Sequence, residues 1–286
     1  MKKTIKINAS VSATIATGSY QNLKPGFLIE ETIEDEGKTS DNYKNDVYLK
    51  ERARELYDIA YGLLKEVENN AIIERIERER ADLRFVASPT SGKMLPSVTS
   101  IINYDADFFV PAEDLRQYAS AGQITHSRVA EFIKTGEWKD AKDISDVWTD
   151  LIVVTKGSLK LPLNTGNFPI FLQKYPIEKM ENGYRGFDDK VGYCGEPDIF
   201  GIPQFKEAEQ IKSIIDIKRT ASKIKDGIQV ALYCNLFNLE QGIIIPLNDK
   251  TSQGYSKPII YDKKSLEGYY KMGLEKRESF RRRYGI

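Results

Sequence analysis

Histidine, cysteine and long apolar runs are scarce in this sequence, and each scarcity narrows the possible functions. Cys194 and Cys234 form no Cys-x-x-Cys pair, so we expect neither a zinc ribbon nor a thioredoxin-like dithiol, and we expect two buried, reduced thiols. No run of about 18 apolar residues occurs, so no membrane span is predicted. Polar residues follow Met1-Lys2-Lys3 where a secretory signal would be apolar, so we expect no signal peptide and a cytoplasmic protein.

An excess of charge is also missing, because 42 basic residues balance 42 acidic ones. Net charge therefore gives no support to nucleic-acid binding, and any DNA contact must come from a local patch. The densest basic patch lies near the C-terminus and contains Arg281, Arg282 and Arg283. These arginines can contact a DNA backbone, with Phe280 or Tyr284 stacking on a base, or they can be solvated cations at a helix end.

The pattern of the first part of the chain predicts a small N-terminal module over 1–85. Residues 4–33 alternate like two or three strands, and 47–83 have apolar residues at helical spacing before becoming highly charged. Two prolines, a glycine and small polar residues make 86–96 a predicted linker. A recombination or replication protein, single-stranded DNA or another copy of the chain is a possible partner of this module.

The second part, 96–286, has the pattern of an α/β domain with a mixed central sheet flanked by helices. Helices are predicted at 111–120, 122–135, 224–239 and from 264, and strands at 191–202, 210–219, 242–246 and 258–261. No periodicity is clear between 135 and 170. Strands and helices therefore alternate, with a hairpin in the middle.

Two strand motifs carry the strongest chemical signal. Asp198 opens a short apolar strand, and Asp216 and Lys218 alternate with isoleucines on the next one. Alternation puts Asp216 and Lys218 on one face of their strand, and a hairpin brings Asp198 to them. Two carboxylates and one ammonium suit a hard divalent cation such as Mg²⁺ and the activation of a water. Each motif taken alone also fits an exposed ion pair or a turn.

A single histidine and one helical pair complete the candidate set. His126 shares a predicted helix face with apolar residues, so it points toward the sheet, either as a hydrogen-bonded core residue or as a ligand. Gln229 and Tyr233 stack four residues apart on an apolar helix. A buried glutamine needs hydrogen-bond partners, so Gln229 either caps a loop or steadies Lys218 or a phosphate.

Four short motifs follow one another in the sequence: Gly-x-x-x-His, Gly-x-x-Asp, Asp-x-Lys and Gln-x-x-x-Tyr. Their order resembles that of the RecB-type branch of the PD-(D/E)XK nucleases, which includes phage exonucleases. The likeness covers about two-thirds of the chain, from 96 to 283, and includes the lead-in Pro96–Ile102. It implies the restriction-endonuclease-like fold and a Mg²⁺- or Mn²⁺-dependent deoxyribonuclease acting in DNA replication, recombination or repair. A phage or a bacterium is the expected source.

The resemblance also implies roles for single residues. His126, Asp198, Asp216 and the backbone carbonyl of Ile217 would bind the metal, and Lys218 would orient the attacking water. Gln229 and Tyr233 would support the site from their helix, and Glu178 would add a further acidic residue. The sequence departs from the family at Pro197, where an apolar residue of another kind is common. Two cysteines cannot hold the iron–sulfur cluster of some relatives, and no Gly-x-x-x-x-Gly-Lys-Ser/Thr sequence indicates a bound nucleotide.

An exonuclease acting at DNA ends is the preferred expectation. A structure-specific endonuclease is the nearest alternative, and a non-catalytic DNA- or protein-binding module on the same fold is another. A last alternative is an unrelated α/β domain in which the motifs match by chance. In that case Asp198 and Asp216 would lie far apart in space.

Overall fold

A computed structural model describes most of the chain. The described residues are 3–13, 15–18, 21–35, 42–80, 82–106, 112–139, 167–247 and 251–286. The chain divides into two compact units, the first comprising 1–87, 92–94 and 281–286 and the second 88–91 and 95–280. The first unit thus takes in the N-terminal part of the chain together with its last six residues.

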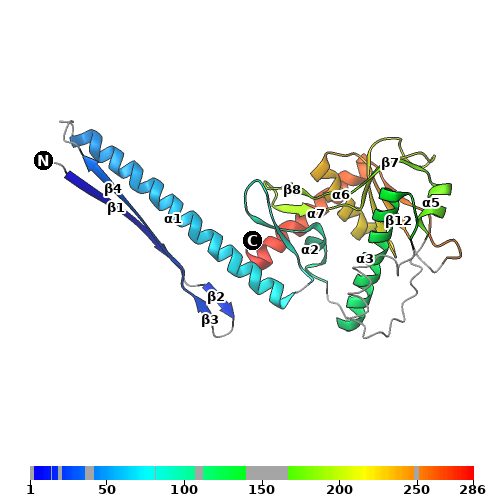
Figure 1. Ribbon diagram of the computed structural model, residues 1–286, viewed down its shortest axis with the longest axis horizontal. Coiled ribbons are helices and arrows are strands. Elements are labelled where there is room, and N and C mark those ends of the chain that lie inside the picture. The colour runs from blue at the N-terminus through cyan, green and yellow to red at the C-terminus, as the bar shows by residue number, and fades with distance from the viewer. Residues whose placement is uncertain are drawn as a thin grey trace. The chain divides into compact units, whose positions relative to one another are not determined.

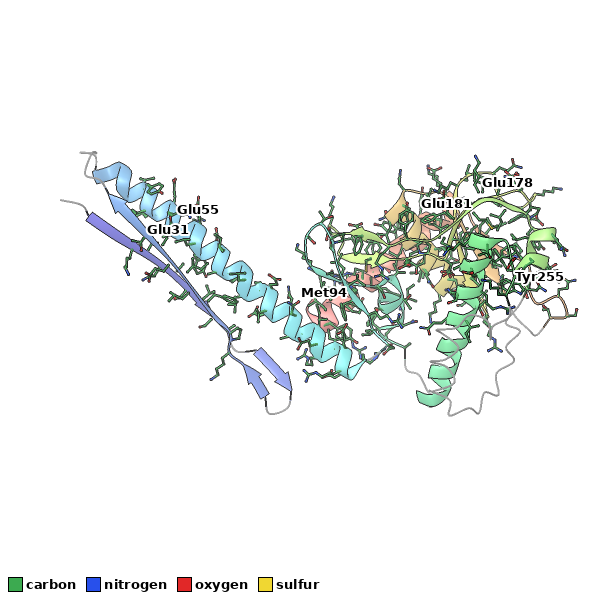
Figure 2. All side chains as sticks on the ribbon, in the orientation of Figure 1. Glu31, Glu55, Met94, Glu178, Glu181 and Tyr255 are labelled. Atoms are coloured by element: carbon green, nitrogen blue, oxygen red, sulfur yellow. The ribbon has the colours of Figure 1, made fainter. Side chains whose placement is uncertain are left out.

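The first unit is a long hairpin lying along one helix (Figure 1). Strands β1 (Lys3–Ser12) and β4 (Gly26–Asp35) pair antiparallel, and the short strands β2 (Ile15–Gly18) and β3 (Gln21–Leu23) form a second ribbon between them in sequence. Helix α1 (Asn42–Glu79) packs Leu56 on the buried hairpin residues Ile7 and Ala9. Arg52 of α1 also pairs with Glu31 and Glu55, which Figure 2 labels.

The second unit contains a five-stranded mixed sheet with the order β13-β12-β11-β10-β7. Its strands are β7 (Ile177–Asn182), β10 (Ile199–Pro203), β11 (Ser213–Lys218), β12 (Gly242–Pro246) and β13 (Ile259–Tyr261). Strands β11 and β12 are parallel, and the other neighbours are antiparallel. Both central strands are buried on both faces, which explains their nearly continuous isoleucine runs.

Helices cover both faces of this sheet. Helices α3 (Ala112–Thr135) and α5 (Phe168–Lys174) pack on the face that carries Ile215, Ile217 and Ile245. Helix α6 (Lys223–Phe237) connects β11 to β12 and covers the other face, where Val230 contacts Gly242. Asn238 ends α6 in the left-handed conformation, with φ of 52°. The chain is therefore a mixed α/β protein, as predicted.

Smaller elements surround this core. Helix α2 (Val98–Asn103) begins at the cap Ser97, strands β8 (Gly186–Asp188) and β9 (Tyr193–Gly195) form a ribbon, and helix α7 (Lys263–Tyr284) ends the chain. Tight packing of α7 on α6 places Leu232 against Gly273. The prediction located the strands of the sheet between 191 and 261 but missed β7 and α2.

Two predictions about the segments before the sheet are wrong. The two helices expected at 111–120 and 122–135 are one helix, α3, because a glycine inside a helix costs only about 1 kcal/mol and buried residues hold the second half. The expected linker contains strands β5 (Phe85–Ala87) and β6 (Met94–Pro96). Hydroxyls of Ser88 and Ser91 donate to the Asp189 carboxylate at 2.9 and 2.5 Å, which fixes the turn between these strands.

Cys194 and Cys234 are buried free thiols, as expected. Cys194 lies against the backbone carbonyls of Leu95 and Pro96, and Cys234 against that of Gln241. Among the helices that the structure describes, none is both long and apolar enough to cross a bilayer.

Candidate active site

The hairpin of β10 and β11 brings Asp198 to Asp216. The ladder ends where Ile199 pairs with Ile215, so the backbone N–H of Ile217 points beyond the end of β10. Asp198, immediately before β10, fills that place and accepts this N–H at 2.6 Å. The carbonyl of Ile217 faces the same gap, because both polar groups of a strand residue point to one side. The two aspartates therefore lie close together, which is not the arrangement expected of chance motif matches.

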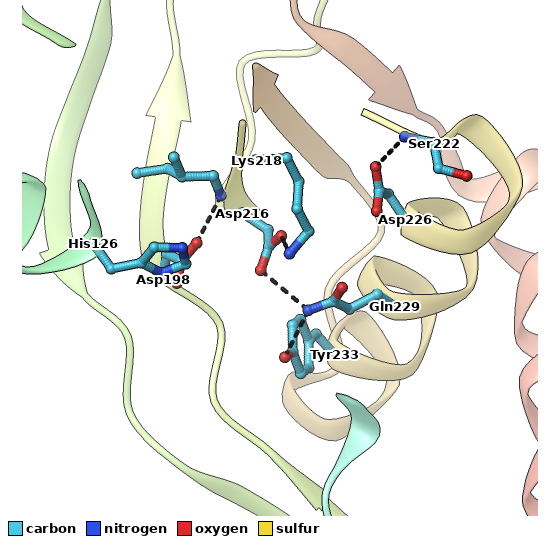
Figure 3. A network of polar contacts seen from close by, with 9 residues as sticks. His126, Asp198, Asp216, Lys218, Ser222, Asp226, Gln229 and Tyr233 are labelled. Atoms are coloured by element: carbon cyan, nitrogen blue, oxygen red, sulfur yellow. Dashed lines mark hydrogen bonds and ion pairs between the residues drawn. The ribbon is translucent and has the colours of Figure 1, made fainter. Parts of the chain in front are cut away.

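His126 reaches the other oxygen of Asp198 from α3. Its Nδ1 lies 2.6 Å from Asp198 Oδ1, as Figure 3 shows. The imidazole is 41% exposed and the carboxylate only 15%, so the histidine lies at the rim of the cluster. Asn182 fixes this approach, because its side-chain amide donates to the carbonyl of Ala130, one turn after His126. The expected orientation of His126 toward the sheet is confirmed.

Asp216 lies between the lysine of its own strand and the glutamine of α6. The Lys218 ammonium forms an ion pair with its Oδ2, and the Gln229 amide lies 3.4 Å from its Oδ1 (Figure 3). The same amide donates to the Tyr233 hydroxyl at 3.0 Å. The expectation of a half-buried face needs correction, because α6 covers it and leaves Asp216 only 3% exposed.

The two carboxylates differ in their proton affinity. Burial raises the pKa of Asp216 to about 6. The negative charge of Asp198 also raises it, whereas the positive charge of Lys218 lowers it. Burial also acts on Asp198, but His126, Lys218 and the Ile217 N–H outweigh it and lower the pKa of that carboxyl below its usual value. The pKa of His126 is raised, because Asp198 outweighs the effect of burial. Environment alone thus separates two identical side chains.

The donor atoms of this cluster suit a hard divalent cation. Asp216 Oδ2 is buried and receives no well-directed hydrogen bond from a described residue, although Lys218 neutralises it. Within the described residues, no three His, Cys, Asp or Glu side chains already form a metal cage. Mg²⁺ needs only one or two carboxylates and takes its other ligands from water and phosphate. Asp198, Asp216 and the Ile217 carbonyl can supply the protein ligands, with His126 beside them.

Glu178 is not brought to the cluster. It lies on β7 opposite Ile202, which is four residues along the chain from Asp198. That separation corresponds to roughly 13 Å along the strand. Its side chain, labelled in Figure 2, is exposed. Its sequence position suggested a role, but the register of β7 decides against it.

The basic C-terminal segment is only partly as expected. Phe280 is fully buried and meets Tyr104 edge-on, so the hypothesis that it stacks on a base is wrong. Lys276 pairs with Asp105 at 3.0 Å, and Arg277 is buried and donates to the Gly192 carbonyl. The side chains of Arg281, Arg282 and Arg283 are exposed, and their contact with DNA stays a prediction.

Asp226 is a buried site neighbour that the sequence reasoning missed. It is 4% exposed, and its carboxylate accepts the backbone N–H of Ser222, the N-cap of α6, at 2.6 Å. This bond fixes the start of the helix that carries Gln229. An acidic residue in the first turn of a predicted helix was the available signal.

The glycines of the two glycine-containing motifs have different roles. A Cβ on Gly195 would lie 2.5 Å from the Tyr233 ring and 2.9 Å from Val98, whereas a Cβ on Gly122 would meet no atom within 4 Å. We expect Gly195→Ala to destabilise the protein by about 1–3 kcal/mol through displacement of Tyr233. We expect Gly122→Ala to stabilise α3 by up to about 1 kcal/mol. Urea unfolding of both variants measures this, and equal effects would contradict the packing role of Gly195.

Comparisons with known proteins add little to this geometry. No family model and no curated protein matches the chain. The solved structures that match include one titled "Crystal structure of SSO0001", with 14% identity and a TM-score of 0.23, over 59% of this chain and 88% of that chain. A likeness at this TM-score carries no argument, so the residues of the site have to support any function.

Proposed function

We propose that this protein is a metal-dependent DNA nuclease with the restriction-endonuclease-like PD-(D/E)XK fold, and that it acts as an exonuclease. One observation carries the proposal. Asp198, Asp216 and Lys218, expected on two neighbouring strands, meet in one largely buried cluster, with Gln229 and His126 from the helices on either side. Burial also raises the pKa of Asp216 to about 6, and perturbed carboxylates of this kind cluster at functional sites.

Asp198 and Asp216, with the Ile217 carbonyl, would hold Mg²⁺ or Mn²⁺. When bound, the cation supplies Lewis-acid polarisation of the scissile phosphate and a lowered pKa for a water molecule. The expected sources of the protein are a phage or a bacterium.

Each remaining side chain has a task that follows from its contacts. Lys218 extends its ammonium to the edge of the carboxylates, where it can orient the attacking water and stabilise negative charge on the phosphate oxygens. Gln229 fixes the orientation of Asp216, and Tyr233 fixes Gln229 in turn. His126 orients Asp198 through their hydrogen bond. The site thus combines charge with side chains held in place before the substrate arrives.

The direct test is digestion of DNA substrates that differ in their ends. Linear and closed circular DNA, single- and double-stranded and end-labelled, is incubated with the full chain in Mg²⁺, Mn²⁺ or EDTA. We expect linear DNA to be degraded only with a divalent cation, because the carboxylates need the metal to approach a phosphate. Circular DNA should resist an enzyme that starts at ends.

The outcomes separate the candidate functions. Cutting of circles with metal would replace exonuclease by endonuclease action, and a preference for branched DNA would point to a structure-specific enzyme. Binding of DNA without cleavage under every metal condition would refute catalysis and favour a non-catalytic binding module on the same fold.

A further inference from the structure

Lys225 continues the row of α6 side chains that borders the cluster. Residues four apart stack on one helix face, and Lys225, Gln229 and Tyr233 follow this spacing. Gln229 contacts both Asp216 and Tyr233, so this face of α6 is the one turned toward the site. Lys225 lies one helical turn, about 5.4 Å, nearer the start of α6. It extends the site beyond the residues that the sequence motifs contain.

Lys225 lies near two carboxylates, Asp226 and Asp105, but forms an ion pair with neither of them. Its side chain is exposed and makes no ion pair with a described residue. Asp226 accepts the N–H of Ser222, and Asp105 pairs with Lys276. The two carboxylates that influence Lys225 therefore have other partners.

The electrostatic surroundings of Lys225 link it to Lys218. Partial burial lowers the pKa of Lys225, Asp226 raises it, and the positive charges of Lys218 and Lys276 lower it further. Crowding of cations at this edge favours an anion beside them.

We propose that Lys225 holds the phosphate next to the scissile phosphate of the bound DNA strand. This inference rests on the proposed nuclease function. A nucleic-acid strand carries one phosphate for every nucleotide, so a strand held at Asp216 and Lys218 presents a second anion nearby. The row formed by Lys225 and Gln229 directs the strand toward the N-terminal end of α6. Lys225 is thus a positioning residue that contacts the backbone and not the reacting atoms.

Binding of a short oligonucleotide tests the contact with the phosphate. A labelled single strand of about 12 nucleotides is titrated with the full chain in Ca²⁺, by fluorescence anisotropy, between about 50 and 200 mM salt. Lys225→Ala should weaken binding about 3- to 10-fold and lower the slope of log affinity against log salt by about 0.7. Lys225→Arg should restore both, because it keeps the charge.

Lys223→Ala is the matched control. Lys223 is also an exposed lysine in the first turn of α6, but two residues of offset, about 200°, turn it to the other side of the helix. Its carbonyl accepts the Tyr261 hydroxyl, and alanine keeps that backbone bond. We expect this variant to bind DNA like the wild type.

Hydrolysis of bis(p-nitrophenyl) phosphate with Mn²⁺ separates the two proposals. This small diester has no neighbouring phosphate, so Lys225→Ala should cleave it at the wild-type rate. Equal DNA affinities and salt slopes for Lys225→Ala and Lys223→Ala would overturn the inference while leaving the nuclease proposal intact. Loss of small-diester hydrolysis in Lys225→Ala would overturn it too. A wild type that neither binds DNA nor hydrolyses the diester would refute both proposals.

Discussion

Asp216→Asn is expected to lower metal-dependent DNA cleavage by at least about 1,000-fold. The substitution keeps the shape of the side chain and removes the charge that would bind the metal between β11 and α6. Loss of one carboxylate ligand costs several kcal/mol of transition-state stabilisation, and each ~1.4 kcal/mol corresponds to a factor of ten in rate. Single-turnover cleavage of end-labelled linear DNA at saturating enzyme and Mg²⁺ measures the effect.

The Asp216→Asn variant should fold, and the difference between its stability and that of the wild type should show the titration of Asp216. The pKa of this carboxyl is about 6 in the folded chain, against 3.8 for an unperturbed aspartate. Between these values the folded chain binds the extra proton, so the contribution of Asp216 to stability falls as the pH rises through the window. In EDTA, the free energy of unfolding of Asp216→Asn, relative to that of the wild type, should therefore rise by about 1–3 kcal/mol between pH ~4 and pH ~7.

Asp226→Asn provides the matched control for the cleavage measurement. Asp226 is similarly buried, but its carboxylate accepts a backbone N–H at the start of α6, a bond that the asparagine oxygen can also form. This variant should keep cleavage within a few-fold of the wild type. Wild-type cleavage by Asp216→Asn, in a folded protein, would refute the assignment of Asp216 to the metal.

Lys218→Ala is the second substitution with a large expected effect, a loss of about 100- to 1,000-fold in the rate of cleavage. Removing a single preorganised group that stabilises developing negative charge costs this much in other enzymes. Binding of Mn²⁺, measured by calorimetry, should persist, because both carboxylates remain and one of them loses its ion-pair partner. The loss therefore belongs to the chemical step and not to metal binding.

Lys212→Ala is the control for Lys218→Ala, because Lys212 lies just before the first residue of β11 and Lys218 is its last residue. Lys212 is exposed, pairs with Glu181 of β7 at 3.1 Å and precedes β11. Exposed pairs contribute about 0–1 kcal/mol, so stability and cleavage should stay near wild type. If Lys218→Ala cleaves as fast as Lys212→Ala, the proposed role of the ammonium is wrong.

The sequence by itself determined the local geometry of the candidate site. Isoleucines that alternate with Asp216 and Lys218 fix the two polar residues on one face of β11, because side chains alternate along a strand. Four-residue spacing likewise aligns Gln229 with Tyr233 on α6. These periodicities act within one element, so they can be predicted without knowledge of the fold. The metal, the substrate and the partner of the N-terminal module stay predictions.

Only the tertiary structure decided which of these faces meet. The end of the β10–β11 ladder leaves the Ile217 N–H for Asp198, and the packing of α3 brings His126 to the same carboxylate. Strand register carries Glu178 away from the site, and the packing of α7 buries Phe280. Contacts between segments far apart in sequence depend on register and on the fit of packed surfaces, which no local pattern of residues contains.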